Sequence, residues 1–382
     1  MRLQHRDGQT VHLSYCTNVH AAEDLDGIIE QLDTYALPIR EKLGTDVLGL
    51  GLWIAAPAAS ALVADRSALT RLTRAITERG LEVVTLNGFP YAAFQQPVVK
   101  GAVYEPDWTT PARLTYTLNL ARILEHLMPD DAARGSVSTL PLAWRTPWDS
   151  ERQDSCRRSL DVLANELARQ DRTIRVAFEP EPGCVVENTA QAAAMLRDAD
   201  TERLGVCLDL AHLACAWEDP AAALERLRAA GVPIVKTQVS AALASDDPER
   251  DAEVLARYVE PRFLHQTRGR RGLSTDDLDD ALAGDRGQPW RIHYHVPIHA
   301  QPEPPLRATT GVLRDALRHL VGGPVALCDH LDVETYTWNV LPEGSRPRDP
   351  AELVAGIAAE LDHARGLLEE LNLNREKATW QG

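Results

Sequence analysis

The chain has 382 residues and a formal net charge of −16, with 40 Lys and Arg residues against 56 Asp and Glu residues. Proteins that bind nucleic-acid backbones rely on basic patches, so this charge balance argues against nucleic acid as a partner. The six cysteines form no C-x-x-C pair, and several lie in apolar runs, which is typical of free thiols in a reducing compartment. No apolar run approaches the length of a membrane span and no secretory h-region is evident, so we expect a cytoplasmic protein without an integral membrane segment.

Short β-branched apolar runs alternate with amphipathic segments along nearly the whole chain, which is the pattern of βα units around a parallel sheet. About eight such units favour a closed (β/α)8 TIM barrel, and α/β barrels of this length form one domain, here residues 1–382. Residues 67–80 and 219–231 are typical of the intervening helices, because each segment ends at a glycine. We expect strands at residues 10–18, 47–55, 81–89, 135–143, 173–181, 204–212, 233–241 and 325–338.

Two regions interrupt this alternation. Residues 90–112 form a long loop with prolines and aromatic residues after the third strand, and residues 242–306 form an insertion between the seventh and eighth strands. Long loops in a compact domain are usually lids or binding loops, although linkers are an alternative. We therefore expect the insertion to contribute to the mouth of an active site.

Polar side chains gather at the C-terminal ends of the expected strands, which is where TIM barrels build their active sites. Their types include the carboxylate, imidazole and amide groups that can bind metals. They are Tyr15, Asn18 and His20 on the first strand, Asn87 on the third, Glu179 and Glu181 on the fifth, Asp209 and His212 on the sixth, Lys236, Gln238 and Ser240 on the seventh, and His330, Asp332 and Glu334 on the eighth.

The stretch "FEPEPG" (178–183) places Glu179 and Glu181 on one face at the exit of an apolar strand, and a proline after each glutamate stops sheet pairing. Buried carboxylates are costly unless paired, and a divalent cation held by several oxygen ligands removes that cost. The alternative is a set of buried salt bridges with arginines such as Arg175. For Glu181 and Asp332, a place behind the ligands or a simple strand-end salt bridge is as open as direct contact with the metal.

The order of "FEPEPG", "DLAH", "KTQVS" and "VETYTW" along the chain resembles the xylose-isomerase-like TIM barrel superfamily of sugar isomerases and epimerases. More narrowly, "LSYCTNVH", "EPEPGC", "HYHVPIH" and "VETYTWNVLP" resemble the EboE-type metabolite-traffic barrel of bacterial ebo clusters. This resemblance covers essentially the whole chain.

The resemblance implies that Glu179, Asp209 and Glu334 are metal carboxylates and that His212 either contacts the substrate or supports the ligands from behind. Where relatives commonly supply a histidine ligand on the seventh strand, this chain has Gln238. Either Gln238 coordinates the metal through its amide oxygen, or a histidine of the insertion replaces it. The candidates are His295 and His293, with His299 and His265 behind them.

The function implied is a divalent-metal-dependent isomerase or epimerase that acts on a sugar or cyclitol-like polyol, possibly phosphorylated, through an enediolate. The cation would be Mn, Mg, Co or Zn. Glu179 and Glu334 would move the proton, with His212 assisting as a catalytic residue. The substrate-binding residues expected are Tyr15, Asn18, Asn87, Lys236, His295 and Glu181. A homo-oligomer is possible.

Two other functions stay open. One is a non-catalytic barrel that binds and hands over a metabolite, as the traffic label of the family suggests. The other is a metal-dependent phosphodiester hydrolase, which the acidity of the chain disfavours. The basic run "RGRRG" (268–272) could clamp an anionic substrate group, although such a run in a loop is usually solvated.

Overall fold

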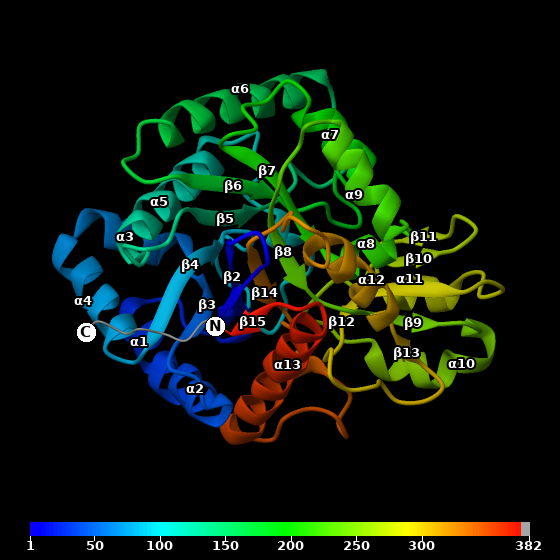
Figure 1. The fold of residues 1–382 in the computed structure, drawn as a ribbon. Coiled ribbons are helices and arrows are strands. Elements are labelled where there is room, and N and C mark those ends of the chain that lie inside the picture. The colour runs from blue at the N-terminus through cyan, green and yellow to red at the C-terminus, as the bar shows by residue number, and fades with distance from the viewer. Residues whose placement is uncertain (376–382) are drawn as a thin grey trace.

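The computed structural model describes residues 1–375, and residues 376–382 of the expected 1–382 domain lie outside the described part. Eight parallel strands follow one another in chain order around a barrel, which closes because β14 pairs with β2 (Figure 1). Closure removes both edges of the sheet, and the predicted (β/α)8 barrel is confirmed. The barrel strands are β2 (Thr10–Cys16), β3 (Leu48–Trp53), β4 (Leu81–Asn87), β5 (Gly135–Thr139), β6 (Ile174–Phe178), β7 (Leu204–Asp209), β8 (Ile234–Val239) and β14 (His330–Val333).

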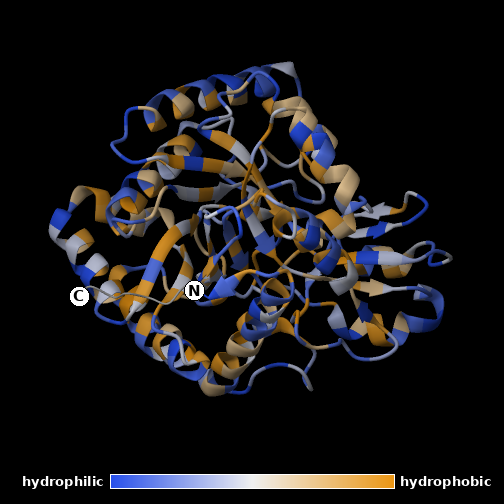
Figure 2. Ribbon diagram, viewed as in Figure 1, coloured by the Kyte–Doolittle hydropathy of each residue, from blue (hydrophilic) through white to orange (hydrophobic). Residues whose placement is uncertain are grey.

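Helices surround the barrel and turn their apolar faces toward it, as the orange stripes in Figure 2 show. In α4, for example, Leu69, Leu72 and Ile76 are buried at helical spacing, and the Asp65 side chain caps the N-terminus. The helices are α1 (Leu25–Gln31), α2 (Leu37–Leu43), α3 (Ala56–Ala64), α4 (Arg66–Thr77), α5 (Pro111–Leu127), α6 (Ser150–Leu167), α7 (Thr189–Leu196), α8 (Leu210–Cys215), α9 (Pro220–Ala229), α12 (Thr310–Val321) and α13 (Pro350–Glu370). Within residues 1–375, no helix is both long and apolar enough to cross a membrane.

All eight barrel strands are shorter than predicted, and for two of them the hydrogen bonds show the reason. The segment expected as a strand over 204–212 ends at Asp209, because the Asp209 side chain accepts a hydrogen bond from the His212 backbone N–H (2.8 Å) and so caps α8. The segment expected over 325–338 is a strand only at His330–Val333. Before it, the Leu327 N–H bonds back to the Leu320 carbonyl of α12, which withdraws that residue from the sheet.

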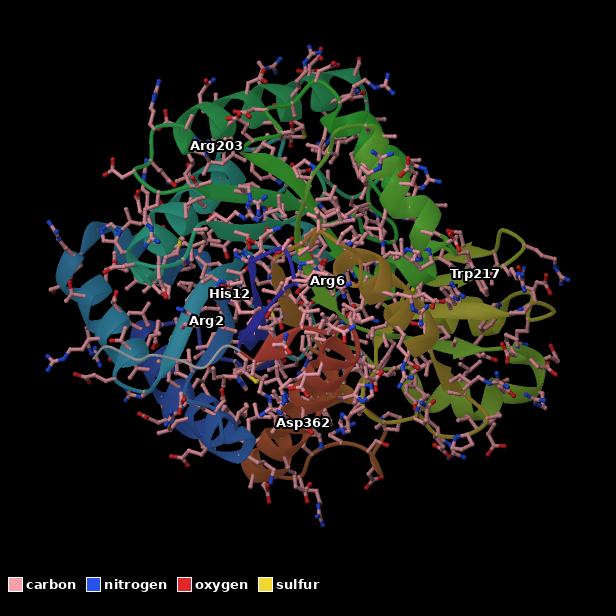
Figure 3. The ribbon with its side chains drawn as sticks, in the orientation of Figure 1. Arg2, Arg6, His12, Arg203, Trp217 and Asp362 are labelled. Atoms are coloured by element: carbon pink, nitrogen blue, oxygen red, sulfur yellow. The ribbon has the colours of Figure 1, made fainter. Side chains whose placement is uncertain are left out.

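The insertion after β8 folds into a five-stranded antiparallel sheet of its own, at the right of Figure 1. Its strand order is β11-β10-β12-β9-β13. It is anchored to the barrel by Trp217, labelled in Figure 3, whose indole N–H donates to the Arg268 carbonyl (3.0 Å) and whose ring lies 3.9 Å from the Arg291 guanidinium carbon. Its elements are β9 (Ala242–Ser245), α10 (Pro248–Leu255), β10 (Thr267–Gly269), β11 (Ser274–Thr275), α11 (Leu278–Ala283), β12 (Trp290–His295) and β13 (Arg307–Ala308).

A buried ion pair lies inside the barrel between two neighbouring strands. The Lys236 ammonium on β8 is 2.9 Å from Asp332 Oδ2 on β14, and both side chains are fully buried. Gly51 on β3 makes room for this pair, because a Cβ at that position would stand 1.9 Å from Asp332 Oδ2. Below the barrel, β1 (Arg2–Gln4) joins β2 and β15 (Asn374–Arg375) in antiparallel pairing.

Candidate functional site

The ends of β6 and β7 deliver a carboxylate and a histidine to the same point. Glu179 follows β6 directly, and Asp209 is the last residue of β7. His212 lies in the first turn of α8, where its Nδ1 is 2.9 Å from the Pro180 carbonyl and 3.9 Å from Glu179 Oε1. The proline after Glu179 therefore supplies the acceptor that orients His212. Potential ligand atoms of Glu179, Asp209 and His212 all lie within 4.8 Å of one another.

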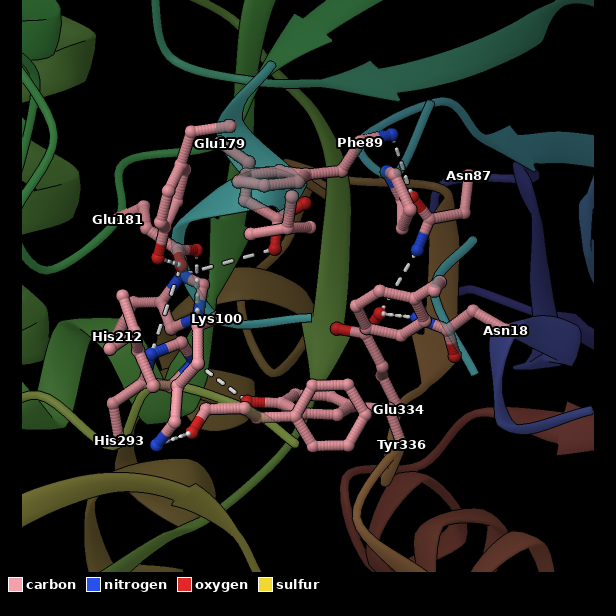
Figure 4. Close-up of a pocket in the computed structure, with 16 residues that line it drawn as sticks. Asn18, Asn87, Phe89, Lys100, Glu179, Glu181, His212, His293, Glu334 and Tyr336 are labelled. Carbon is pink, nitrogen blue, oxygen red and sulfur yellow. Dashed lines mark hydrogen bonds and ion pairs between the residues drawn. The ribbon is translucent and has the colours of Figure 1, made fainter. Parts of the chain in front are cut away.

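Glu334 reaches the same region from the end of β14. Asn18 and Asn87 donate their side-chain N–H groups to its Oε1, at 2.8 and 3.0 Å (Figure 4). The Asn87 amide is held in this orientation because its Oδ1 accepts from the Phe89 backbone N–H (3.0 Å). Both bonds fall on one oxygen of Glu334, so Oε2 carries neither of them.

A second group of potential ligands includes a histidine of the insertion. The ligand atoms of Asp209, His295 and Glu334 lie within 4.8 Å of one another, and His295 Nε2 is 3.8 Å from Asp209 Oδ2. His295 Nδ1 is 2.8 Å from the Glu334 carbonyl, which can only accept, so Nδ1 carries the ring proton and Nε2 offers a lone pair. His295 is thus oriented as a metal-binding histidine is, by a hydrogen bond from its other nitrogen.

The carboxylates of this region are buried together, and their pKa values reflect it. Burial, followed by the charges of Glu334, Asp209 and Glu181, raises the pKa of Glu179 well above its usual value. Burial also raises the pKa of Glu334 to about 7, with Asp209 adding to the effect. The alternative was a buried salt bridge between these carboxylates and Arg175, but Arg175 Nη2 lies 3.4 Å from Asp329 Oδ1 instead. A concentration of like charges without a paired arginine is the arrangement that a cation relieves.

Glu181 stands beside a pair of histidines. His212 Nε2 is 2.9 Å from His293 Nε2 and 3.4 Å from Glu181 Oε2. Burial lowers the pKa of His212 to about 4 and that of His293 well below its usual value. Tyr104 donates to Glu181 Oε1 (2.8 Å), which fixes that carboxylate against the wall of the cavity.

Gln238 is fully buried on β8, where it pairs in register with Asp209 of β7 and Asp332 of β14. Within residues 1–375, neither its amide oxygen nor its amide nitrogen has a hydrogen-bond partner. Gln238 lies at the same height in the barrel as Asp209, which suits a metal ligand. No hydrogen bond from the described residues fixes the orientation of its amide, whereas a hydrogen bond from Nδ1 fixes that of the His295 ring.

A cavity with about 490 Å³ of empty space, including its open mouth, lies above these strand ends (Figure 4). Of the substrate-binding residues predicted from the sequence, Asn18, Asn87 and Glu181 line it, together with Glu179, Glu334 and His212. Tyr15, Lys236 and His295 do not line it. The Tyr15 hydroxyl contacts His20 Nε2 (3.3 Å), and Lys236 is paired with Asp332 inside the barrel.

The sequence analysis missed the aromatic and apolar side chains that line the rest of the cavity. They come from the loop after β4, from η3 (Lys100–Tyr104), from the insertion and from the segment after β14. Tyr336 could have been found, because it lies two residues after Glu334, whereas nothing in the loop sequences distinguishes lining residues from their neighbours. These side chains are Phe89, Pro90, Phe94, Val103, Tyr104, Phe263, Leu264 and Tyr336.

A buried carboxylate on α13 holds the segment that follows Glu334. Glu360 Oε1 accepts from the Thr335 hydroxyl (2.7 Å) and from the Ile298 backbone N–H (3.1 Å), and Oε2 accepts from the Trp338 indole N–H (2.8 Å). Glu360 therefore ties α13, the insertion and the end of β14 to one another next to the cavity. Burial raises its pKa from 4.5 to about 7.

This shift predicts a pH dependence of folding stability. The folded protein holds the Glu360 proton more tightly than the unfolded chain. The contribution of Glu360 to the free energy of unfolding is therefore fully present below pH 4.5 and is lost as the pH rises through about 7. In urea unfolding, the free-energy difference between wild type and Glu360→Gln should change by about 3 kcal/mol between pH 4.5 and pH 8. The exposed Glu370→Gln on the same helix is the control. A difference for Glu360→Gln that does not vary with pH would contradict the assignment.

The solved structures similar to this chain include two sugar epimerases. D-Allulose 3-epimerase from Methylomonas sp. is 11% identical, with 96% of this chain and 100% of that chain covered and a TM-score of 0.53. 3-Keto-D-glucoside 4-epimerase from E. coli is 14% identical, with 94% and 99% covered and a TM-score of 0.51. A xylose isomerase-like TIM barrel protein from Mycobacterium smegmatis, solved in complex with magnesium, is 12% identical, with 94% and 98% covered and a TM-score of 0.52. At these identities the similarity establishes the fold.

No curated protein sequence matches the chain. The family described as xylose isomerase-like TIM barrel matches residues 41–272, which is more than half of the 382 residues. The match spans β3 to β10 and includes Glu179 and Asp209. The closed barrel and this match together show that the chain belongs to the xylose isomerase-like TIM barrel family.

Proposed function

We propose that the protein is a divalent-metal-dependent isomerase or epimerase that acts on a sugar or cyclitol-like polyol through an enediolate. The observation that carries this proposal is a set of buried potential ligand atoms without hydrogen-bond partners among residues 1–375. They are Glu179 Oε2, Asp209 Oδ2 and His295 Nε2. Buried polar atoms are almost always satisfied, so three unsatisfied ones on residues of two overlapping ligand groups fit a bound cation.

The residues that would hold the cation are Glu179, Asp209, His295 and Glu334. Three carboxylates and one imidazole suit Mn, Mg, Co or Zn. When bound, a divalent cation polarises the substrate carbonyl and stabilises negative charge on the enediolate oxygens. Gln238 is the alternative to His295, and we favour His295 because the hydrogen bond from its Nδ1 fixes the direction of Nε2.

Glu179 and Glu334, which reach the cavity from different strands, transfer the proton. One takes the proton from the carbon next to the carbonyl, and the other returns a proton to the opposite face or to the neighbouring carbon. Glu179 and Glu334 both line the cavity, where a carboxyl group can exchange a proton with a substrate carbon. Asn18 and Asn87 keep Glu334 Oε1 in place, and His212 lies where it can contact a substrate oxygen.

The fold shared with sugar epimerases supports this reaction class, and the magnesium complex of the Mycobacterium smegmatis protein supports a metal in a barrel of this family. We further propose that the chain is of the EboE type. We also propose that it is a single domain, in which the insertion supplies His295 and His293 to the site. A metal-free barrel that carries a metabolite is the alternative function.

Elemental analysis of the purified protein tests the proposal. We expect about one divalent ion per chain in the wild type and a loss of affinity of about a hundredfold or more in Asp209→Asn, because a ligand oxygen is removed. Asp276→Asn, the same change at an ion pair of the insertion with Arg145, is the matched control and should retain the metal. Absence of metal from both wild type and Asp209→Asn would favour the carrier.

A further inference from the structure

The cavity has a polar floor and an apolar wall. The floor consists of side chains at the strand ends, among them the carboxylates of Glu179, Glu181 and Glu334. The wall comes from the covering segments, and its main part is a cluster of three rings, which we call the aromatic wall: Phe94, Phe263 and Tyr336. The ring centroids are 5.1 Å apart for Phe94 and Phe263, 5.5 Å for Phe94 and Tyr336, and 4.9 Å for Phe263 and Tyr336.

The aromatic wall is part of a larger apolar surface. Phe89 and Leu264 add further apolar surface to the cavity. A continuous apolar surface from several segments suits an apolar ligand group, because burying apolar area on both sides favours binding.

The cavity also lacks a free cation for an anionic substrate group. Lys100 is the sole lysine, and arginine is absent, among the described residues that line it. The three N–H donors of Lys100 are matched by the Glu260 carbonyl (3.2 Å), the Phe263 carbonyl (2.8 Å) and Asp277 Oδ2 (2.5 Å). The ammonium group therefore joins η3 to the insertion and has no donor left for a phosphate.

The basic run at 268–272 does not fill this role. The Arg268 side chain is buried against Glu187 (2.5 Å) and also donates to the Thr275 carbonyl (2.8 Å). No residue of the run is among the described residues that line the cavity. Among the described residues that line the cavity, the polar groups of the floor are carboxyl, amide and imidazole groups, so no lysine or arginine there can pair with a phosphate.

We propose that the substrate is an uncharged polyol or hydroxy-carbonyl compound that carries an apolar, ring-sized substituent, and that phosphate esters are excluded. This inference rests on the proposed function, because it takes the polyol end to lie at the floor. The polyol would meet Asn18, Asn87, His212 and the carboxylates, and the substituent would lie against the aromatic wall. The site thus selects its substrate at the covering segments as well as at the strand ends.

Calorimetric titration of the protein as purified with three probes tests this inference: phenyl β-D-glucopyranoside, D-glucose and D-glucose 6-phosphate. Burial of the phenyl group should make the phenyl glucoside bind about tenfold tighter than glucose or better. Glucose 6-phosphate should bind more weakly than glucose. The inference is overturned if the phosphate ester binds at least as tightly as the phenyl glucoside, or if the phenyl group adds no affinity.

A variant in the aromatic wall locates the effect. Phe94→Ala should reduce the advantage of the phenyl glucoside, which is the ratio of its affinity to that of glucose, to about threefold or less, because it removes apolar contact area. Phe94→Leu, which keeps much of that area, should retain most of the advantage. Val98→Ala, in the same loop at a side chain that is 63% exposed, is the control and should behave as wild type. An unchanged advantage in a folded Phe94→Ala protein would remove the aromatic wall from the inference.

These titrations are independent of metal content and turnover. If the elemental analysis finds no metal but the phenyl preference depends on Phe94, the proposed reaction fails while the ligand class stands. If the metal is present and glucose 6-phosphate binds best, the reaction stands and the ligand class fails.

Discussion

Replacing His295 with alanine is expected to weaken binding of divalent metal by about a hundredfold or more, since even residues behind a metal's ligands commonly contribute ten- to a hundredfold. The physical reason is the loss of the lone pair on Nε2, which is 3.8 Å from Asp209 Oδ2 and whose direction is fixed by the bond from Nδ1 to the Glu334 carbonyl. Competition with a chromophoric chelator at constant pH measures the change. Turnover should fall with the metal and recover in part at high metal concentration.

Gln238→Ala is the matched control, because Gln238 is the other candidate for the same position. Its amide is neutral and without a hydrogen bond within the described part of the chain, so we expect its removal to change metal affinity by less than about tenfold. Both side chains are fully buried, so each variant should first be shown to fold by thermal unfolding. The reverse ranking, with the larger loss in Gln238→Ala, would assign the metal to β8 and remove His295 from the ligand set.

Replacing Glu334 with glutamine is expected to lower kcat by about 10³ to 10⁴, because the variant loses both a metal carboxylate and a proton-transfer group. The side-chain shape is kept, and Asn18 and Asn87 can still donate to the amide oxygen, so the fold should persist. The measurement is turnover together with exchange of the substrate C–H proton with deuterated water, followed by NMR. Both should stop, because the same group moves the proton in each.

Glu181→Gln is the control for this second prediction, since it makes the same chemical change in the same cavity. Glu181 is held by the Tyr104 hydroxyl and lies beside His212, outside both ligand groups that contain Asp209. We expect a loss of about tenfold, which is typical of a residue that supports a site without transferring the proton. Full activity of Glu334→Gln on the true substrate would refute the proposed proton-transfer role.

The sequence predicted the barrel and much of its floor for one physical reason. Parallel strands in a closed barrel bring their C-terminal ends to one rim, so polar residues at those ends must converge wherever the helices lie. Glu179, Asp209 and Glu334 follow this rule. The geometry of a strand gives the face on which a side chain lies but not its depth in the barrel. Lys236 was for this reason expected at the substrate and instead lies buried beside Asp332.

The sequence named His295 as a candidate but could not distinguish it from His293 or Gln238, and it did not indicate Phe94 and Phe263 of the aromatic wall. His295 reaches the site through an antiparallel sheet, in which β12 pairs with β9 and packs on α8, and such long-range packing leaves no local pattern. The aromatic residues lie in loops, where nothing in the spacing tells an inward side chain from an outward one. What the sequence did indicate was the presence of two long covering segments, because they break the βα alternation.

The hydrogen bond from His295 Nδ1 to the Glu334 carbonyl has a consequence for how a ligand enters. It couples the insertion directly to the end of β14, and Glu360 fastens the same two segments from behind. The insertion therefore cannot move away from the barrel as a rigid body without breaking these hydrogen bonds at the floor of the cavity. The far part of the loop after β4 is held mainly by the insertion, through Lys100 and the backbone bonds of residues 99 and 100 to the Arg262 carbonyl, and Gln95 adds a bond to the Asn18 carbonyl (2.6 Å). Ligand entry and release should thus require this loop to detach from the insertion. Asp277, which pairs with Lys100 and does not line the cavity, would then influence the rate of both.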